Sequence, residues 1–408
     1  MSLNTTPSGE RIHIGIFGRR NAGKSSLINA LTNQNLAIVS EHKGTTTDPV
    51  YKAMELLPLG PVMLIDTPGI DDEGELGKLR IEKAYQVLHK CDIALLVVDT
   101  ACGISEEDKR LWRKIEERKL PALLVLNKAE TLSEMQQALV TMSALKLTKH
   151  CFLVSTKTKR NITELKEAIA AFQPQEAKHQ LLGDLINPGD IVVLVTPIDS
   201  AAPKGRLILP QQQVLRDILD NIGIAVVVQV NELASALAKL AFPPRLVVTD
   251  SQAFAQVNKI VPPTTPLTSF SILMARYKGS LPNAVKAVRT LDNIQAGDKI
   301  LISEGCTHHR QCGDIGTVKL PAWIRNYTKV EPEFSFSSGT EFPEDLSAYK
   351  LVIHCGACML NEKEMQHRNK TALTQGIPMT NYGIAIAYMH GILKRTIAPL
   401  PDIAKLLD

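Results

Sequence analysis

The stretch Gly18-Arg19-Arg20-Asn21-Ala22-Gly23-Lys24-Ser25-Ser26 decides the fold of the first part of this chain. The apolar run Ile12–Phe17 before it predicts a buried strand, and Ser25–Leu31 after it has the apolar spacing of a helix. A Gly-x4-Gly-Lys-Ser loop between a strand and a helix turns its backbone N–H groups toward phosphate oxygens. We expect Lys24 to contact the β- and γ-phosphates and Ser25 to bind Mg²⁺. The loop residues expected at the nucleotide are Asn21, Ala22, Gly23, Lys24, Ser25 and Ser26.

Length and composition favour a folded protein of two or three domains. The 408 residues are 44% hydrophobic and 22% charged, which is ordinary for globular proteins. A net charge of only +4 predicts neither a nucleic-acid partner nor an anionic membrane partner. The chain has no apolar run of about 18 residues and no signal-peptide pattern at its start. Its seven cysteines, an odd number, argue against a disulfide framework, so we expect a cytoplasmic protein.

Strand-like and helix-like segments alternate up to about residue 174. This alternation predicts an α/β domain, residues 1–174, with a parallel sheet covered by helices on both faces. In such sheets the ligand lies beyond the carboxyl ends of the strands. The predicted strands are Ile12–Phe17, Val62–Ile65, Ile93–Val98, Leu123–Leu126 and Phe152–Val154.

Polar motifs follow the second, fourth and fifth of these strands. Asp66-Thr67-Pro68-Gly69 follows the second, where Asp66 can hold Mg²⁺ through water and the Gly69 amide can contact a γ-phosphate. The motif after the fourth strand is Asn127-Lys128-Ala129-Glu130, and the motif after the fifth is Ser155-Thr156-Lys157. The stretch Gly44-Thr45-Thr46-Thr47-Asp48 lies between the phosphate loop and Asp66.

In this order and at this spacing, the five motifs resemble the GTPase domain of translation-factor-related proteins, and most of all the Era and TrmE group. The resemblance implies that Glu130 accepts hydrogen bonds from guanine in place of the usual Asp. It also implies a first switch at residues 44–48, with Thr46 joining Ser25 and Asp66 at Mg²⁺. The residues that it places at the guanine base are Asn127, Lys128, Glu130, Ser155, Thr156 and Lys157.

Two residues bear on the rate of GTP hydrolysis. Ile70 stands where Ras-like enzymes place a water-orienting Gln, and an isoleucine cannot hydrogen-bond to water, so we expect slow hydrolysis. Asn21 stands where potassium-dependent members of the group help to bind a cation. The resemblance therefore implies stimulation by K⁺, which would stabilise developing charge on the phosphates.

Two smaller α/β domains with parallel-type sheets are expected after a polar linker near residues 173–180. The first, residues 181–265, contains strands such as Ala225–Val230 that are apolar throughout and need cover on both faces. No catalytic cluster is visible in this segment. We interpret it as a dimerisation domain, because a second copy of the chain would supply the missing cover.

The last domain, residues 266–408, carries cysteines just past the ends of two predicted strands. Cys306-Thr307-His308 follows Lys299–Ser303, and His354-Cys355-Gly356-Ala357-Cys358 follows Leu351–Ile353. Three interpretations fit this pattern. Cys355 and Cys358 could be a thioredoxin-like redox pair, three cysteines with a histidine could bind structural zinc, or the cysteines could hold an iron–sulfur cluster.

The arrangement Cys-x-His, 45 intervening residues and His-Cys-x-x-Cys, joined to a GTPase domain, resembles the FeFe-hydrogenase maturation GTPases, the HydF family. The resemblance covers the whole chain. It implies that a 4Fe-4S cluster is held by Cys306, Cys355 and Cys358. His308 or His354 would be a fourth ligand or would hydrogen-bond to the cluster.

The same resemblance implies a homodimeric GTPase that acts as a scaffold or carrier. Such a protein receives a diiron precursor made with two radical-SAM maturases and delivers it to apo FeFe-hydrogenase. Two alternatives remain at this point. One is an RNA- or ribosome-associated GTPase of the Era and TrmE type, although no basic nucleic-acid module follows residue 175. The other is a GTPase with a structural zinc site.

Overall fold

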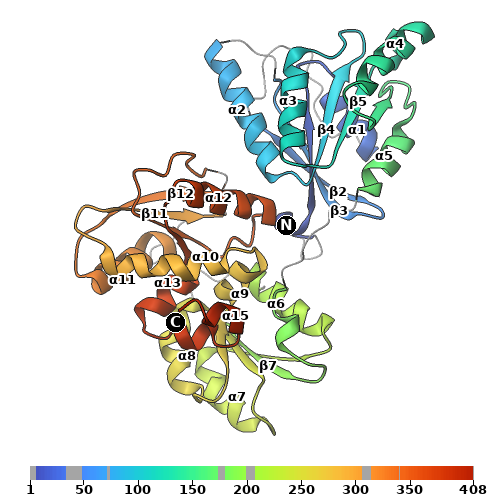
Figure 1. The fold of residues 1–408 in the computed structure, drawn as a ribbon. Coiled ribbons are helices and arrows are strands. Elements are labelled where there is room, and N and C mark those ends of the chain that lie inside the picture. The colour runs from blue at the N-terminus through green and yellow to red at the C-terminus, as the bar shows by residue number, and fades with distance from the viewer. Residues whose placement is uncertain are drawn as a thin grey trace. The chain divides into compact units, whose positions relative to one another are not determined.

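The computed structural model describes residues 6–33, 48–70, 74–172, 180–198, 207–305, 314–339 and 341–407. The chain divides into two compact units, Met1–Glu176 and Ala177–Asp408. Figure 1 shows a central sheet flanked by helices in the first unit and two further sheets in the second. The expected α/β fold class, a P-loop domain followed by parallel sheets, is confirmed.

The first unit is built on a six-stranded sheet in the order β2-β3-β1-β4-β5-β6. All neighbours pair in parallel except β2 and β3. The strands are β1 (Ile12–Phe17), β2 (Val50–Leu56), β3 (Gly60–Asp66), β4 (Ile93–Asp99), β5 (Ala122–Asn127) and β6 (Cys151–Leu153). The helices are α1 (Lys24–Thr32), α2 (Gly74–Lys90), α3 (Glu106–Glu117), α4 (Glu134–Leu145) and α5 (Ile162–Ala171).

Side chains of β1 alternate between two buried clusters, one on each face of the sheet. Ile14 and Ile16 pack into the cluster that holds Leu165 of α5, whereas Phe17 packs into the one that holds Leu111 of α3. This alternation follows from the two-residue period of a strand. The helices on the two faces keep the polar ends of the strands in place.

The strand β2 was not predicted from the sequence. Its residues alternate between exposed and partly buried, and it pairs antiparallel with β3 at the edge of the sheet. A half-exposed edge strand has no continuous apolar run, which was the pattern used to find the other strands. The five predicted strands all occur, each within two residues of its expected bounds.

The second unit contains two four-stranded parallel sheets, in the orders β10-β9-β7-β8 and β12-β11-β13-β14. The first has strands β7 (Ile191–Val195), β8 (Ile224–Val228), β9 (Leu246–Thr249) and β10 (Leu267–Ser269). The second has strands β11 (Lys299–Glu304), β12 (Glu333–Ser338), β13 (Leu351–His354) and β14 (Met379–Asn381). Thus β10, beyond the expected domain boundary at residue 265, still belongs to the first of these sheets.

Ten helices accompany these sheets among the described residues. The first five α-helices are α6 (Leu209–Asp220), α7 (Leu233–Lys239), α8 (Phe254–Ile260), α9 (Phe270–Tyr277) and α10 (Leu281–Ala287). The others are α11 (Leu320–Thr328), α12 (Glu362–Thr374), α13 (Tyr382–Met389), α14 (Leu393–Ile397) and α15 (Pro401–Ala404).

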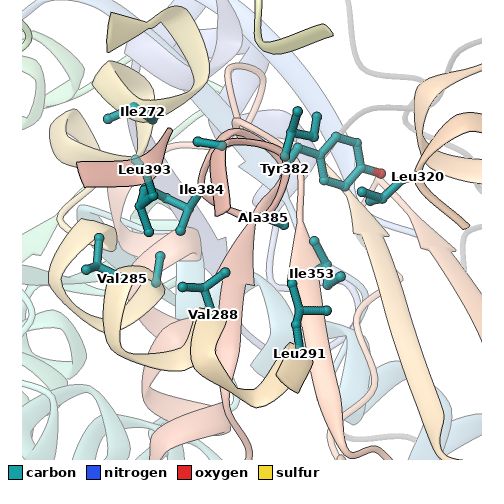
Figure 2. Packing of buried hydrophobic residues seen from close by; sticks show 14 of the residues in the cluster. Ile272, Val285, Val288, Leu291, Leu320, Ile353, Tyr382, Ile384, Ala385 and Leu393 are labelled. Carbon is teal, nitrogen blue, oxygen red and sulfur yellow. The ribbon is translucent and has the colours of Figure 1, made fainter. Parts of the chain in front are cut away.

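One large apolar cluster contains residues of helices α8 and α9 together with residues of strands β11 and β13. Figure 2 shows Ile272 of α9 and Val285 of α10 in the same cluster as Ile353 of β13 and Ile384 of α13. Helices α8 and α9, which follow strands of the first sheet, therefore pack against strands of the second sheet. Across all described residues, no helix combines the length and the apolar character needed to span a membrane.

The apolar spacing from Tyr382 to Leu393 is compatible with one helix, but the chain forms two helices there. α13 ends at Met389, and Gly391 has a φ of 69°, in the left-handed region that favours glycine. A new helix, α14, starts at Leu393. Apolar residues on both sides of the break still pack together, because Ile384 of α13 and Ile392 after the turn lie in or against the same cluster.

Candidate functional site

The phosphate loop has the backbone conformation that its glycines predict. Gly23 has a φ of 93° and stands at the N-terminus of α1, and an added Cβ there would lie 2.2 Å from Asn127 Nδ2. Gly18 has a φ of 142°, and an added Cβ there would lie 2.2 Å from the carbonyl oxygen of Val97. Lys24 donates hydrogen bonds to the backbone oxygens of Gly18, at 2.9 Å, and Arg19, at 2.8 Å. The loop is thus wrapped around the lysine side chain.

The two described Mg²⁺ candidates lie together. Ser25 Oγ donates a hydrogen bond to Asp66 Oδ2 over 2.5 Å. Burial raises the pKa of Asp66, and the Ser25 hydrogen bond and the Lys24 charge oppose that rise. This pair of oxygens, one hydroxyl and one carboxylate, is the donor type that Mg²⁺ prefers. Thr46, the third candidate, lies outside the described residues.

Asn127 connects the guanine motifs to the phosphate loop. Its fully buried side chain donates from Nδ2 to the carbonyl oxygen of Ala22, at 3.1 Å. Its Oδ1 accepts a hydrogen bond from the backbone N–H of Thr156, at 3.2 Å. Three loops that are far apart in the sequence are therefore held together by one side chain.

The remaining guanine candidates surround this link. Ser155 is buried and its Oγ accepts from the N–H of Thr158 at 3.0 Å, while Lys157 is exposed. Lys128 adopts a φ of 65° just before the short turn Ala129–Thr131, in which Glu130 is exposed. An exposed carboxylate at this place is accessible to a base.

Two residues of the site were missed by the sequence patterns. Asp99, the last residue of β4, pairs with Lys128 Nζ at 2.7 Å and so holds the lysine stem. Its position at a strand end was the available signal. Arg19 connects the phosphate loop to α3. Its Nη2 donates to the carbonyl oxygen of Gly103 at 2.8 Å, and its Nε lies 3.4 Å from Oδ2 of Asp108 in α3.

Two residues expected to affect hydrolysis are also described. Ile70 is buried and directly follows the buried Gly69. Asn21 is exposed at the start of the loop with a φ of 57°. This left-handed conformation is one that asparagine tolerates better than most residues do.

In the second unit, Cys355 and Cys358 lie on one turn after β13. The Sγ atom of Cys355 accepts hydrogen bonds from the backbone N–H groups of Gly305, at 3.1 Å, and Ala357, at 3.4 Å. Ala357 has a φ of 55°, which closes the turn. Burial raises the pKa of the Cys355 thiol, and it raises that of Cys358 to about 12.

The other sequence candidates for this site lie in a part of the chain that is not described. They are Cys306 and His308, which follow Gly305. In the described ranges, no group of three or more His, Cys, Asp or Glu side chains is arranged to hold a metal ion. The structure therefore places Cys355 and Cys358 on one turn and brings Gly305, the residue before Cys306, into contact with Cys355.

His354 is held between two partners. Its Nδ1 lies 3.0 Å from the carbonyl oxygen of Cys355, and its Nε2 lies 3.0 Å from Arg368 Nη1. Burial, together with the Arg368 charge, lowers the pKa of His354 to about 3. The imidazole is therefore neutral, with Nδ1–H donating to the carbonyl and Nε2 accepting from the guanidinium.

Arg368 is fully buried and was not recognised from the sequence. It pairs with Glu364 at 2.9 Å and donates from Nη2 to the carbonyl oxygen of Gly339 at 2.7 Å. It also lies over the ring of Phe342, 5.0 Å from the centroid. The spacing of Glu364 and Arg368, one helical turn apart, was the signal that could have shown the pair.

Three family models match successive parts of the chain. A 50S ribosome-binding GTPase model matches residues 13–128. A Hydrogen maturase F dimerization domain model matches residues 181–279, and a Hydrogen maturase F tetramerization domain model matches residues 282–399. The GTPase model covers the phosphate loop and ends at Asn127 and Lys128, the first two residues of the first guanine motif. The tetramerization domain model covers the cysteine turn.

The similar curated proteins match in the GTPase part. GTPase Der of Chlamydia felis is 41% identical over 125 residues, which are 30% of this chain and 26% of that protein. The tRNA modification GTPase MnmE of Helicobacter pylori is 34% identical over 44% of this chain and 40% of its own length. The matches thus span only about a quarter to two-fifths of these relatives.

Among solved structures, Era of Aquifex aeolicus bound to GDP and AlF4⁻ is 20% identical with a TM-score of 0.36. That match covers 53% of this chain and 92% of Era. The two maturase models follow the GTPase model on one chain and together match more than half of its length. The chain therefore belongs to the HydF-type hydrogenase maturase GTPases.

Proposed function

We propose that this protein is a GTP-hydrolysing scaffold that carries a diiron precursor to apo FeFe-hydrogenase. A 4Fe-4S cluster is held by Cys306, Cys355 and Cys358, and the precursor, made with two radical-SAM maturases, is the cargo. When bound, a cluster with three thiolate ligands supplies one iron with an exchangeable position. The protein contributes the thiolates, the hydrogen bonds to them and the nucleotide-dependent unit.

The observation that supports this proposal most is the environment of the Cys355 sulfur. It receives two backbone N–H groups, from Gly305 and Ala357, a pattern that stabilises a metal-bound thiolate. A buried thiol with a raised pKa would otherwise remain protonated. The residues present therefore fit a group that binds as a thiolate complex.

In this proposal His354 supports the cysteine turn and is not an iron ligand. Both of its ring nitrogens are engaged, one by the carbonyl oxygen of Cys355 and one by Arg368. To bind iron, the ring would have to give up the Arg368 hydrogen bond and leave a buried guanidinium with one donor unpaired. His308 remains the histidine candidate for direct binding.

Metal analysis with EPR spectroscopy tests the cluster. Anaerobically reconstituted, dithionite-reduced protein should show iron, sulfide and a 4Fe-4S signal, and Cys355→Ser and Cys358→Ser should lose the signal. Cys151→Ser, a cysteine of β6 in the other unit, is the matched control and should keep it. About one zinc per chain and no iron would instead establish a structural metal site and end the scaffold proposal.

The nucleotide chemistry in this proposal uses the arrangement around Lys24. Ser25, Asp66 and Thr46 hold Mg²⁺ at GTP, and Lys24 and the loop amides neutralise charge on the phosphates. In this proposal GTP binding orders the first switch, residues 44–48, and its relaxation after hydrolysis changes which partner the protein holds.

Potassium should stimulate hydrolysis through Asn21. We expect GTP hydrolysis to be about 10-fold faster in KCl than in NaCl. A bound K⁺ would stabilise the charge that develops on the phosphates, which the apolar Ile70 cannot do. Asn21→Ala should remove the difference between the two salts. An exposed asparagine elsewhere in this unit, Asn33→Ala, is the control. Equal rates in the two salts for the unsubstituted protein would contradict this expectation.

The dimer contact is proposed at the outer edge of β8. Within the described part of the chain, β8 pairs with β7 on one side only, and Ile224 and Val227 are 50% and 42% exposed. The nearby Ile222 is 70% exposed. The unpaired backbone groups of an apolar edge strand can pair with a strand of another chain. The dimerization domain model covers this strand.

Val227→Lys should halve the molar mass measured by size-exclusion chromatography with light scattering. A charge on this strand would oppose pairing between two copies, because each copy brings its own lysine to the contact. Met135→Lys, at an exposed position of α4, should leave the mass unchanged. The edge is not the contact if Val227→Lys has the mass of the unsubstituted protein.

A further inference from the structure

The two sheets of the second unit have the same strand order. Read from β10 the first is β10-β9-β7-β8, and read from β14 the second is β14-β13-β11-β12. The registers also correspond. Ile191 pairs with Ile224 as Lys299 pairs with Glu333, and the other equivalent pairs are Val192–Leu246 with Ile300–Leu351 and Val247–Leu267 with Val352–Met379.

The turns before the first strand of each sheet are equivalent as well. Gly189 and Gly297 have φ values of 85° and 82°, and each is followed by an aspartate. Each aspartate accepts a backbone hydrogen bond of 2.8 Å from the residue three positions before it. Each glycine N–H donates to the residue two positions before the neighbouring strand, Ile222 or Glu331.

The helices that follow the final strand of each sheet, α9 and α13, are also similar in sequence. Pro266–Gly279 and Pro378–Gly391 share Pro, Thr, Ile, Ala and Gly at the same spacing. A side chain at the end of each final strand, Ser269 or Asn381, caps the helix that follows. The two sheets are therefore repeats of one α/β unit, with equivalent hydrogen bonds in both.

Contacts between the equivalent helices α9 and α13 indicate an approximate two-fold relation between the repeats. Residues on the axis of such a relation must meet their own equivalents, and Ser271 and Gly383 are equivalent positions that do so. Gly383 N–H donates to Ser271 Oγ at 3.2 Å, and a Cβ on Gly383 would lie 2.8 Å from Ser271 Cβ. The helix contacts are reciprocal, α10 with β14 and α14 with β10.

In this arrangement the C-terminal end of α9 lies near the second repeat, and the C-terminal end of α13 lies near the first. Lys278, after α9, lines a cavity with Cys355 and Ala357. Its equivalent, His390 after α13, lines a pocket with Gln252 and Ala253, which correspond to Ala357 and Cys358. The strand-end site thus occurs twice. The copy with Cys355 and Cys358 has a lysine at the helix end. In the other copy, Asp250 and Ala253 stand in place of the two cysteines and His390 stands in place of the lysine.

We propose that Lys278 belongs to the cysteine site and supplies a fixed positive charge beside Cys355 and Cys358. Lys278 comes from the first repeat, whereas the two cysteines belong to the second. The inference rests on the iron–sulfur role proposed above. Lys278 is 2% exposed, and its Nζ lies 5.0 Å from the ring centroid of Tyr277. A buried ammonium close to thiolates compensates negative charge that water cannot screen.

The charges that face the two sulfurs agree with this assignment. Burial raises the pKa of the Cys358 thiol and the neighbouring Cys355 adds to that rise, whereas the Lys278 charge opposes it. Burial likewise raises the pKa of Cys355, with Glu304 adding to the rise and Arg368 opposing it. Among the described residues, the Lys278 charge therefore acts on Cys358 and the Arg368 charge acts on Cys355, where the Glu304 carboxylate opposes it.

Redox titration of the reconstituted cluster tests the role of Lys278. At a fixed potential, Lys278→Met should lower the ratio of reduced to oxidised cluster about 10-fold, a shift of about 59 mV to lower potential for one electron. Lys278→Arg should restore the ratio, and His390→Met, the equivalent change in the other repeat, should leave it unchanged. A full cluster with an unshifted potential in Lys278→Met would overturn the proposal.

A metal-free measurement separates this proposal from the iron–sulfur role. The rate of Cys358 alkylation by iodoacetate, divided by its rate with uncharged iodoacetamide, reports the local positive charge. This ratio should fall about 10-fold in Lys278→Met and stay constant in His390→Met. Lys278→Gln takes its place if the Met variant does not fold. A constant ratio refutes the role of Lys278, whereas a reduced ratio without iron uptake supports it and refutes only the cluster.

Discussion

Replacing Lys24 with alanine should lower GTP hydrolysis about 10²–10³-fold. The ammonium group lies between the carbonyl oxygens of Gly18 and Arg19. In the proposed GTP complex the same group neutralises charge on the β- and γ-phosphates, so its removal should leave that charge without compensation in the centre of the loop. Phosphate release under saturating GTP and Mg²⁺ measures the loss.

The control for this variant is Lys146→Ala, at an exposed position after α4. It removes the same charge from the same unit and should retain hydrolysis within about 2-fold. If Lys24→Ala hydrolyses GTP within 3-fold of the unsubstituted protein, the phosphate-loop assignment is wrong. If it is inactive yet still matures hydrogenase normally, the proposed coupling between GTP and delivery fails, whereas the GTPase assignment stands.

Replacing Arg368 with methionine should lower the free energy of unfolding of the second unit by about 3–5 kcal/mol. The substitution leaves Glu364 as a buried carboxylate without its cation, and it removes the donors to His354 Nε2 and the Gly339 carbonyl oxygen. With about 2–4 °C per kcal/mol for a unit of this size, the melting temperature should fall by roughly 10 °C. Calorimetry of the metal-free full-length protein measures the change.

Lys370→Met is the matched control, because Lys370 lies on the exposed face of the same helix. Its effect should stay within about 0.5 kcal/mol. Equal melting temperatures for the two variants would mean that the buried network contributes nothing to stability. Arg368→Lys should recover part of the loss, since it keeps the charge opposite Glu364 but not the planar set of donors.

Much of the nucleotide site could be predicted because its chemistry is local. The glycines at 18 and 23 allow the positive φ values of the phosphate loop, and the strand before it is apolar throughout. The guanine motifs stand directly after strands, so the parallel sheet brings them to one edge. Asp99 escaped notice because its role, holding Lys128, depends on the neighbouring strand and not on its own motif.

In the second unit, the sequence by itself determined the cysteine positions, the strands that carry them and the family. Only the tertiary structure decided that Arg368 is buried against His354 and that Lys278 lines the cavity of Cys355. Both basic residues lie in segments whose patterns are equally compatible with solvent. Sequence periodicity records which face of an element is apolar, whereas the burial of a charge depends on segments that approach from elsewhere in the chain and supply its partners.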